Sequence, residues 1–135
     1  MKIKEILKFL FYIIIDAHPL LYMPPINIYG YKFEIHKNDA DPWPSFPHMH
    51  SEDRKFVLNI YTGQVYRKLT KGCIGIAKEK DMIKLWNNTK FLNIVVESRK
   101  NKPINAGELE NIPYNWLNEE NSNWIKENDV IELSS

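Results

Sequence analysis

The residues best suited to chemistry lie together in one segment, His36–His50, with the sequence HKNDADPWPSFPHMH. It holds three of the four histidines of the chain, together with Asp39, Asp41 and three prolines. Proline fixes φ and removes a backbone donor, so three prolines favour an extended, non-helical path. Functional groups are often carried by loops on a rigid scaffold, which makes this stiff segment the first candidate for a functional site.

One chemistry that the segment could support is metal-free cleavage of a phosphodiester in RNA. One group must remove the 2′-hydroxyl proton and another must protonate the leaving oxygen, and imidazoles suit both roles because they titrate near neutrality. His48 and His50 are the candidate catalytic pair, with His36 or Asp39 as a further catalytic residue. Cationic side chains must also bind the phosphate. The candidate phosphate-binding residues come after this segment in the sequence and are Arg54, Lys55, Arg67 and Lys68.

The same histidines could instead bind a metal. His48 and His50 are two residues apart, so on a strand they would project to one side, as a shared ion requires. Zinc needs at least a third protein ligand, and the nearby candidates are His36, Asp39 and Asp41. This spacing matches no strong zinc motif, so we expect neither a metal nor another cofactor.

A third interpretation is structural. The two histidines would then bind backbone groups, the aspartates would form Asx turns, and Trp43 and Phe46 would fix the segment on a sheet. If Trp43 and Phe46 are exposed, they could instead stack on bases or anchor a protein partner. The residues alone leave these alternatives open.

The elements that must position the segment predict an α+β domain with an antiparallel sheet. Ile26–His36 alternates as a strand with a bulge or bend at Gly30. Lys55–Tyr61 and Gln64–Leu69 predict a β-hairpin that turns at Thr62-Gly63. In that register Tyr61 faces Gln64 and Ile60 faces Val65.

The remaining elements are helices and two further strands. Lys78–Asn88 predicts a short helix, and the β-branched run Phe91–Glu97 predicts a strand. Pro113 breaks Gly107–Asn118, so we expect no single helix across this stretch. An N-terminal helix is expected from an apolar stripe formed by Ile3, Ile6, Leu7, Leu10 and Ile14. Ser122 is expected to cap a short turn through Trp124 and Ile125, and Val130–Leu133 is expected to form a closing strand.

Composition limits the possible classes of protein. The 135 residues, 44% of them hydrophobic, predict one domain over residues 1–135, with the hairpin near 55–69 packed by the N-terminal helix and one or two short helices. The 18 basic and 17 acidic residues give a net charge of +1, so only a local basic face could attract nucleic acid. The apolar run Phe9–Ile15 is too short to span a bilayer. The single cysteine, Cys73, predicts a buried strand thiol and a cytoplasmic location.

A local resemblance adds to this interpretation. Asn38-Asp39-Ala40 followed by Phe46-Pro47-His48-Met49-His50 resembles the aspartate-then-FPH-x-H arrangement of small TumE-type toxins of bacterial toxin–antitoxin pairs. The matched residues cover about a tenth of the chain. The resemblance implies an intracellular bacterial protein that acts on RNA or translation and is silenced by a protein partner.

Two hypotheses therefore enter the structural work. In the first, the chain is a toxin-like or defence-associated protein that acts on nucleic acid, with its working site at His48 and His50. In the second, it is a non-catalytic interaction module, such as an antitoxin, immunity protein or accessory subunit, that binds a partner through Trp43 and Phe46.

Overall fold

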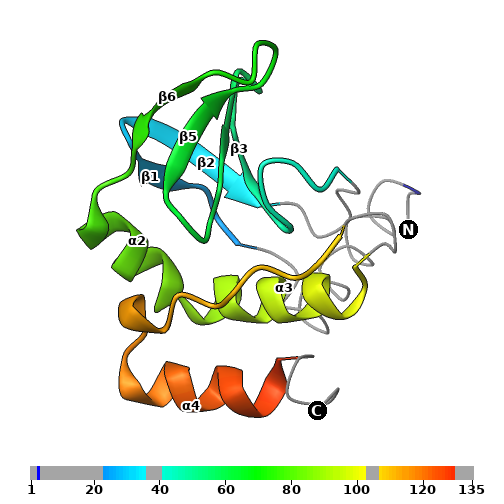
Figure 1. The fold of residues 1–135 in the computed structure, drawn as a ribbon, viewed down its shortest axis with the longest axis vertical. Helices are drawn as coiled ribbons and strands as arrows, with labels where there is room; N and C mark the ends of the chain where they lie inside the picture. The colour runs from blue at the N-terminus through cyan, green and yellow to red at the C-terminus, as the bar shows by residue number, and fades with distance from the viewer. Residues whose placement is uncertain (1–2, 4–22, 36–40, 103–106, 130–135) are drawn as a thin grey trace.

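A computed structural model describes residues 3, 23–35, 41–102 and 107–129 of the chain. Its main feature is a six-stranded antiparallel sheet in which every strand pairs with the next one along the chain (Figure 1). The sheet is curled, and the predicted α+β fold with an antiparallel sheet is confirmed. The strands are β1 (Ile26–Ile28), β2 (Tyr31–Ile35), β3 (Met49–Ser51), β4 (Phe56–Leu58), β5 (Gln64–Arg67) and β6 (Cys73–Ile76).

The described helices follow the sheet and lie at one end of it. They are α2 (Glu79–Trp86), α3 (Thr89–Lys100), the short 3-10 helix η3 (Tyr114–Trp116) and α4 (Glu119–Asn128). Figure 1 shows α3 between the sheet and α4. None of the helices that the structure describes has the length and apolar character needed to cross a membrane.

The core lies between the inner face of the sheet and the first two of these helices. On α2, acidic side chains in the first turn and Lys84 in the last turn complement the helix dipole. The indole of Trp86 donates a 2.8 Å hydrogen bond to the carbonyl of Ile60, so its one polar group is satisfied in the interior. The core includes Phe33, Met49, Leu58 and Val65 from the sheet, and Met82, Leu85, Trp86, Phe91, Leu92 and Val95 from the helices.

Three turns of the sheet lie at the end opposite the helices, which we call the hairpin end. They connect β1 to β2, β3 to β4 and β5 to β6, and in an antiparallel meander such alternate turns share one end. The Tyr29-Gly30 turn has positive φ at both residues, 56° and 80°, as a tight two-residue hairpin requires. Of the segment predicted as one bent strand, residues 26–35 are therefore two strands and a turn.

The first hairpin also reaches the last strand. The Tyr29 hydroxyl donates a 2.9 Å hydrogen bond to the carbonyl of Ile74 in β6. The Tyr29 ring occupies the position that a side chain at Gly75 would take. This contact ties the β1–β2 turn to the edge strand β6 and holds the curl of the sheet.

Two further sequence predictions about secondary structure are wrong. The run Phe91–Glu97 belongs to helix α3, whose start is capped by Asn88 accepting from the amide of Phe91 at 3.1 Å. Its apolar residues recur at helical spacing, so packing on the core overrides the β propensity of Ile94, Val95 and Val96. The second error concerns α4, which is capped by the side chain of Asn118 rather than by Ser122.

The central hairpin is confirmed, but its predicted register and the burial of Cys73 are not. Val65 pairs with Leu58 instead of Ile60, because residues 59–63 form a longer turn than Thr62-Gly63 alone. Cys73 lies on β6 and is exposed. The expected N-terminal helix, apart from Ile3, and the expected strand Val130–Leu133 lie outside the described residues.

Candidate functional site

The candidate site lies on the face of the sheet that points away from the core. Strand alternation and the observed pairing place five residues in one row across this outer face. In order from β2 to β6 they are Glu34, His50, Val57, Tyr66 and Cys73.

Residues 41–48, here called the covering segment, pack on this outer face. Trp43 contacts the ring of Tyr66 edge-on, with 5.4 Å between the ring centroids. His48, at the end of the segment, contacts the ring of His50 at 4.6 Å. Asp41 accepts the amide of Trp43 at 3.0 Å, so the Asx turn expected at Asp41 is confirmed.

His48 and His50 form a buried pair of imidazoles. Their Nε2 atoms are 3.1 Å apart, and the residues are 2% and 4% exposed. The Nδ1 atom of His48 lies 3.0 Å from the carbonyl oxygen of Ser45, which can only accept, so Nδ1 must carry a proton. In the neutral pair, His48 Nε2 is then the acceptor and His50 Nε2 is the donor.

This geometry limits the number of protons that the pair can hold. Only one proton fits between the two Nε2 atoms, because two N–H groups pointing at each other across 3.1 Å would repel. The pair can therefore carry at most one positive charge while the contact lasts. A pair with one neutral and one protonated imidazole has the composition that acid–base catalysis needs.

The loop between β4 and β5 fixes the covering segment. The amide of Ile60 donates to Ser45 Oγ at 3.3 Å, and that hydroxyl donates to the carbonyl of Pro47 at 2.8 Å. The side chain of Asn59 donates to the carbonyl of Pro44 at 3.2 Å. Because Ser45 also binds His48, these bonds fix the position of the imidazole pair relative to the sheet.

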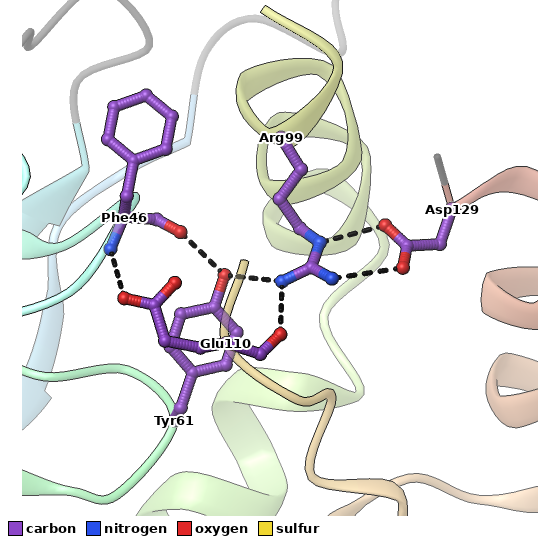
Figure 2. A network of polar contacts seen from close by, with 5 residues as sticks. All are labelled: Phe46, Tyr61, Arg99, Glu110 and Asp129. Carbon is purple, nitrogen blue, oxygen red and sulfur yellow. Dashed lines mark hydrogen bonds and ion pairs between the residues drawn. The ribbon is translucent and has the colours of Figure 1, made fainter. Parts of the chain in front are cut away.

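A second set of contacts reaches the covering segment from the helical end, as Figure 2 shows. The hydroxyl of Tyr61 donates to the carbonyl of Phe46 at 2.7 Å, and Glu110 Oε1 accepts the amide of Phe46 at 3.1 Å. Burial raises the pKa of Tyr61 well above its usual range, so the phenol keeps the proton that it donates. Phe46 is itself buried, which agrees with the structural interpretation of this residue.

Arg99 on α3 connects these contacts to the end of α4. Its guanidinium donates to both carboxylate oxygens of Asp129, at 2.8 and 3.0 Å, and to the carbonyl of Glu110 at 2.7 Å. It also donates to the Tyr61 hydroxyl at 3.1 Å. Burial acts to lower the pKa of Arg99, but the hydrogen bonds that Arg99 donates to Asp129 and Tyr61 outweigh it, so the pKa is raised.

The four predicted phosphate-binding residues all lie at the hairpin end and are exposed. The amide of Lys68 donates to the carbonyl of Lys55 at 2.9 Å, which brings the β3–β4 and β5–β6 turns side by side. Arg54 lies in the first of these turns, and the Arg67 guanidinium lies 5.9 Å from the centroid of the Phe56 ring.

Register adds two lysines that sequence reasoning missed. Two positions beyond the outer-face row, toward the hairpin end, the same alternation gives a second row. It contains Lys32, Glu52, Lys55, Lys68 and Lys71, and we call its four lysines the lysine row. The ammonium group of Lys71 lies 5.1 Å from the centroid of the half-buried Trp43 ring. Lys32 and Lys71 could be assigned to this row only once the pairing of the strands was known.

The structure thus brings His48 and His50 together, as the two-residue spacing predicted. His36 and Asp39 lie outside the described residues, so their predicted catalytic roles stay predictions. Within the described part of the chain, no three His, Cys, Asp or Glu residues are grouped closely enough to hold a metal ion. Comparison with protein-family models, curated proteins and solved structures finds no match to this chain.

Proposed function

We propose that this chain is a small toxin-like or defence-associated protein that acts on RNA and is controlled by a protein partner. In this proposal the lysine row and Arg54 bind the phosphates of a single strand, and His48 and His50 cleave it. The supporting observation is the position of the lysine row, which lies one step along the outer face from His50.

The local charge favours a polyanion at the hairpin end, although the whole chain is nearly neutral. Six basic residues lie in or beside its turns, against the two acidic residues Glu52 and Asp53. Trp43 adds a partly exposed aromatic ring next to Lys71. Cations combined with aromatic rings are typical of surfaces that bind single-stranded nucleic acid.

The proposed chemistry needs no group from outside the chain and its substrate. The neutral imidazole removes the proton of a 2′-hydroxyl while that oxygen attacks the adjacent phosphorus. The bond from phosphorus to the 5′ oxygen breaks, and the protonated imidazole supplies the proton that this oxygen takes. The products are a 2′,3′-cyclic phosphate and a free 5′-hydroxyl, and the charge of the imidazole pair is unchanged.

The buried position of the pair sets a condition on this reaction. The Trp43 end of the covering segment must move away from the outer face, while His48 stays beside His50, before a ribose and a phosphate can reach the two imidazoles. We propose that substrate binding at the lysine row, where Lys71 contacts Trp43, promotes this movement.

The test is cleavage of a single-stranded RNA in the presence of EDTA. We expect a 2′,3′-cyclic phosphate product from RNA and no cleavage of the same sequence made with 2′-deoxyribose. His48→Gln and His50→Gln should each lower the rate by about 10²-fold or more. Lys55→Ala/Lys68→Ala should weaken binding and reduce its salt dependence. The matched control Lys84→Ala/Lys90→Ala removes two exposed lysines from the helices and should change neither.

Two results would contradict this proposal. The first is RNA binding or cleavage that the control pair lowers as much as the lysine-row pair does. The second is cleavage that survives both histidine substitutions or needs a divalent metal.

The alternative is a non-catalytic module that binds a protein partner. One observation favours it, since Leu69 in the β5–β6 turn is 97% exposed, beside the lysine row. In this alternative Trp43 and Leu69 contact the partner, and Phe46 holds the loop from inside. Expression without a partner should then leave bacterial growth unchanged, whereas the enzymatic proposal predicts arrest that His48→Gln relieves.

A further inference from the structure

The rim of the hairpin end opposite the lysine row carries an exposed aromatic ring. Tyr31 is 37% exposed and packs against Phe56, with 4.5 Å between ring centroids and 32° between ring planes. Tyr31 and Phe56 lie on the inner face of the sheet, beyond the end that the helices cover. One side of the Tyr31 ring is therefore supported by Phe56 while part of it stays open to solvent.

An open hollow of about 230 Å³ lies beside this ring. Its walls come from the β1–β2 and β3–β4 turns and the strand ends next to them. The lining residues are Gly30, Tyr31, Lys32, Ser51, Glu52 and Asp53. Lys32 belongs to both the hollow and the lysine row, so the two features meet at one residue.

Asp53 presents a carboxylate to this hollow in a fixed position. Its Oδ1 atom accepts the Ser51 hydroxyl at 2.6 Å and the amide of Lys55 at 3.0 Å. The hydrogen bond from Ser51 contributes most to lowering the pKa of Asp53, and the hydrogen bond from the Lys55 amide contributes next, so the carboxylate stays ionised at neutral pH. Both bonds use Oδ1, which leaves Oδ2 to accept from a ligand.

We propose that this hollow is a nucleobase subsite that selects guanine in a single strand bound at the hairpin end. The inference rests on the proposed function and names the base that the same surface prefers. Guanine places two donors, N1–H and the N2 amine, side by side on its Watson–Crick edge, so Oδ2 of Asp53 can accept a hydrogen bond from either of them. Tyr31 supplies the stacking surface.

The same groups disfavour adenine, cytosine and a phosphate in the hollow. Adenine and cytosine each present a ring nitrogen acceptor beside their single amine, and that acceptor repels a carboxylate. A phosphate in the hollow would face the two carboxylates of Glu52 and Asp53 against the single ammonium group of Lys32, whereas Lys55, Lys68 and Lys71 offer it three cations. The base therefore enters the hollow and the backbone follows the lysines.

The test is fluorescence anisotropy with short oligouridine strands that carry one central G, A, C or inosine, measured in the His48→Gln background so that the strands are not cleaved. We expect the G strand to bind about tenfold more tightly than the A strand, with inosine, which lacks the N2 amine, between them. Tyr31→Ala should weaken binding of the G strand, whereas Tyr31→Phe keeps the ring and should leave it unchanged. Asp53→Asn keeps an acceptor for Ser51 and Lys55 and should abolish the preference for G.

The outcomes separate this inference from the proposed function. If the strands bind in a manner that depends on Lys55 and Lys68 but show no preference for G, the guanine subsite is refuted and the RNA-binding proposal stands. A preference for G that survives both Tyr31→Ala and Asp53→Asn also refutes the subsite. If no strand binds at all, both proposals fail.

Discussion

Removing the carboxylate of Asp129 should destabilise the protein strongly, because it leaves a buried guanidinium without its counter-charge. The side chains of Arg99 and Asp129 are 0% and 3% exposed and form two parallel hydrogen bonds. In Asp129→Ala, Arg99 keeps two neutral acceptors, the hydroxyl of Tyr61 and the backbone carbonyl of Glu110. Neither neutral group balances the charge.

The expected loss is about 3–5 kcal/mol in the free energy of unfolding, which is the usual cost of breaking a buried ion pair from one side. Domains of this size are typically stable by only about 5–15 kcal/mol, so much of the total would be lost. The double variant Arg99→Met/Asp129→Leu removes both charges and should cost less than Asp129→Ala alone.

Urea unfolding followed by tryptophan fluorescence measures these differences, because Trp86 is buried in the core. The surface pair Lys100–Glu97 is a matched control, with 3.8 Å between charged atoms and both side chains 41% exposed. Glu97→Ala should change the unfolding free energy by less than about 1 kcal/mol. A cost for Asp129→Ala as small as this control, or a double variant that costs more than Asp129→Ala, would refute the reasoning.

Three further predictions concern the sheet. Gly75→Ala should lower stability by about 1–3 kcal/mol because the new methyl group displaces the Tyr29 ring, and Tyr29→Ala should remove most of that penalty in a double-mutant cycle. Gly63→Val should cost about 1 kcal/mol or more by chemical denaturation, since φ is 83° there. The pKa of Asp53 is lowered in the folded protein, so the ionised carboxylate stabilises the fold at pH values above its ordinary pKa of 3.8, and this stabilisation is lost as the pH falls below 3.8. The difference in unfolding free energy between wild type and Asp53→Asn should therefore shrink as the pH is lowered through this range.

Local chemistry made part of the fold predictable. The Thr62-Gly63 pair indicated the central hairpin, and Gly63 has the positive φ that such a turn uses. The length of that turn was hidden, because Asn59 organises it by accepting the amides of Tyr61 and Thr62 through its side chain. The turn is two residues longer than predicted, so Val65 lies opposite Leu58 instead of Ile60, while each side chain stays on the same face because strand side chains alternate with a period of two.

Part of the candidate site could likewise be predicted from the sequence, and part could not. The side-by-side position of His48 and His50 followed from strand alternation, which is a local property. The lysine row depends on the register of several strands, and the Arg99–Asp129 pair joins residues thirty positions apart. Neither leaves a periodic pattern in the sequence. The helix at Phe91–Glu97 shows the same effect, since burial on the core outweighed the preference of its β-branched residues.

The helices lie at one end of the sheet and the three turns at the other. This separation determines which parts of the sequence can change during evolution. Exposed turn residues such as Arg54, Lys68 and Leu69 make few contacts with the interior, so their replacement changes surface chemistry at little cost in folding. A lineage built on this scaffold could therefore exchange one ligand for another by altering the turns alone. Its core would keep the same sequence constraints while its recognition surface changed.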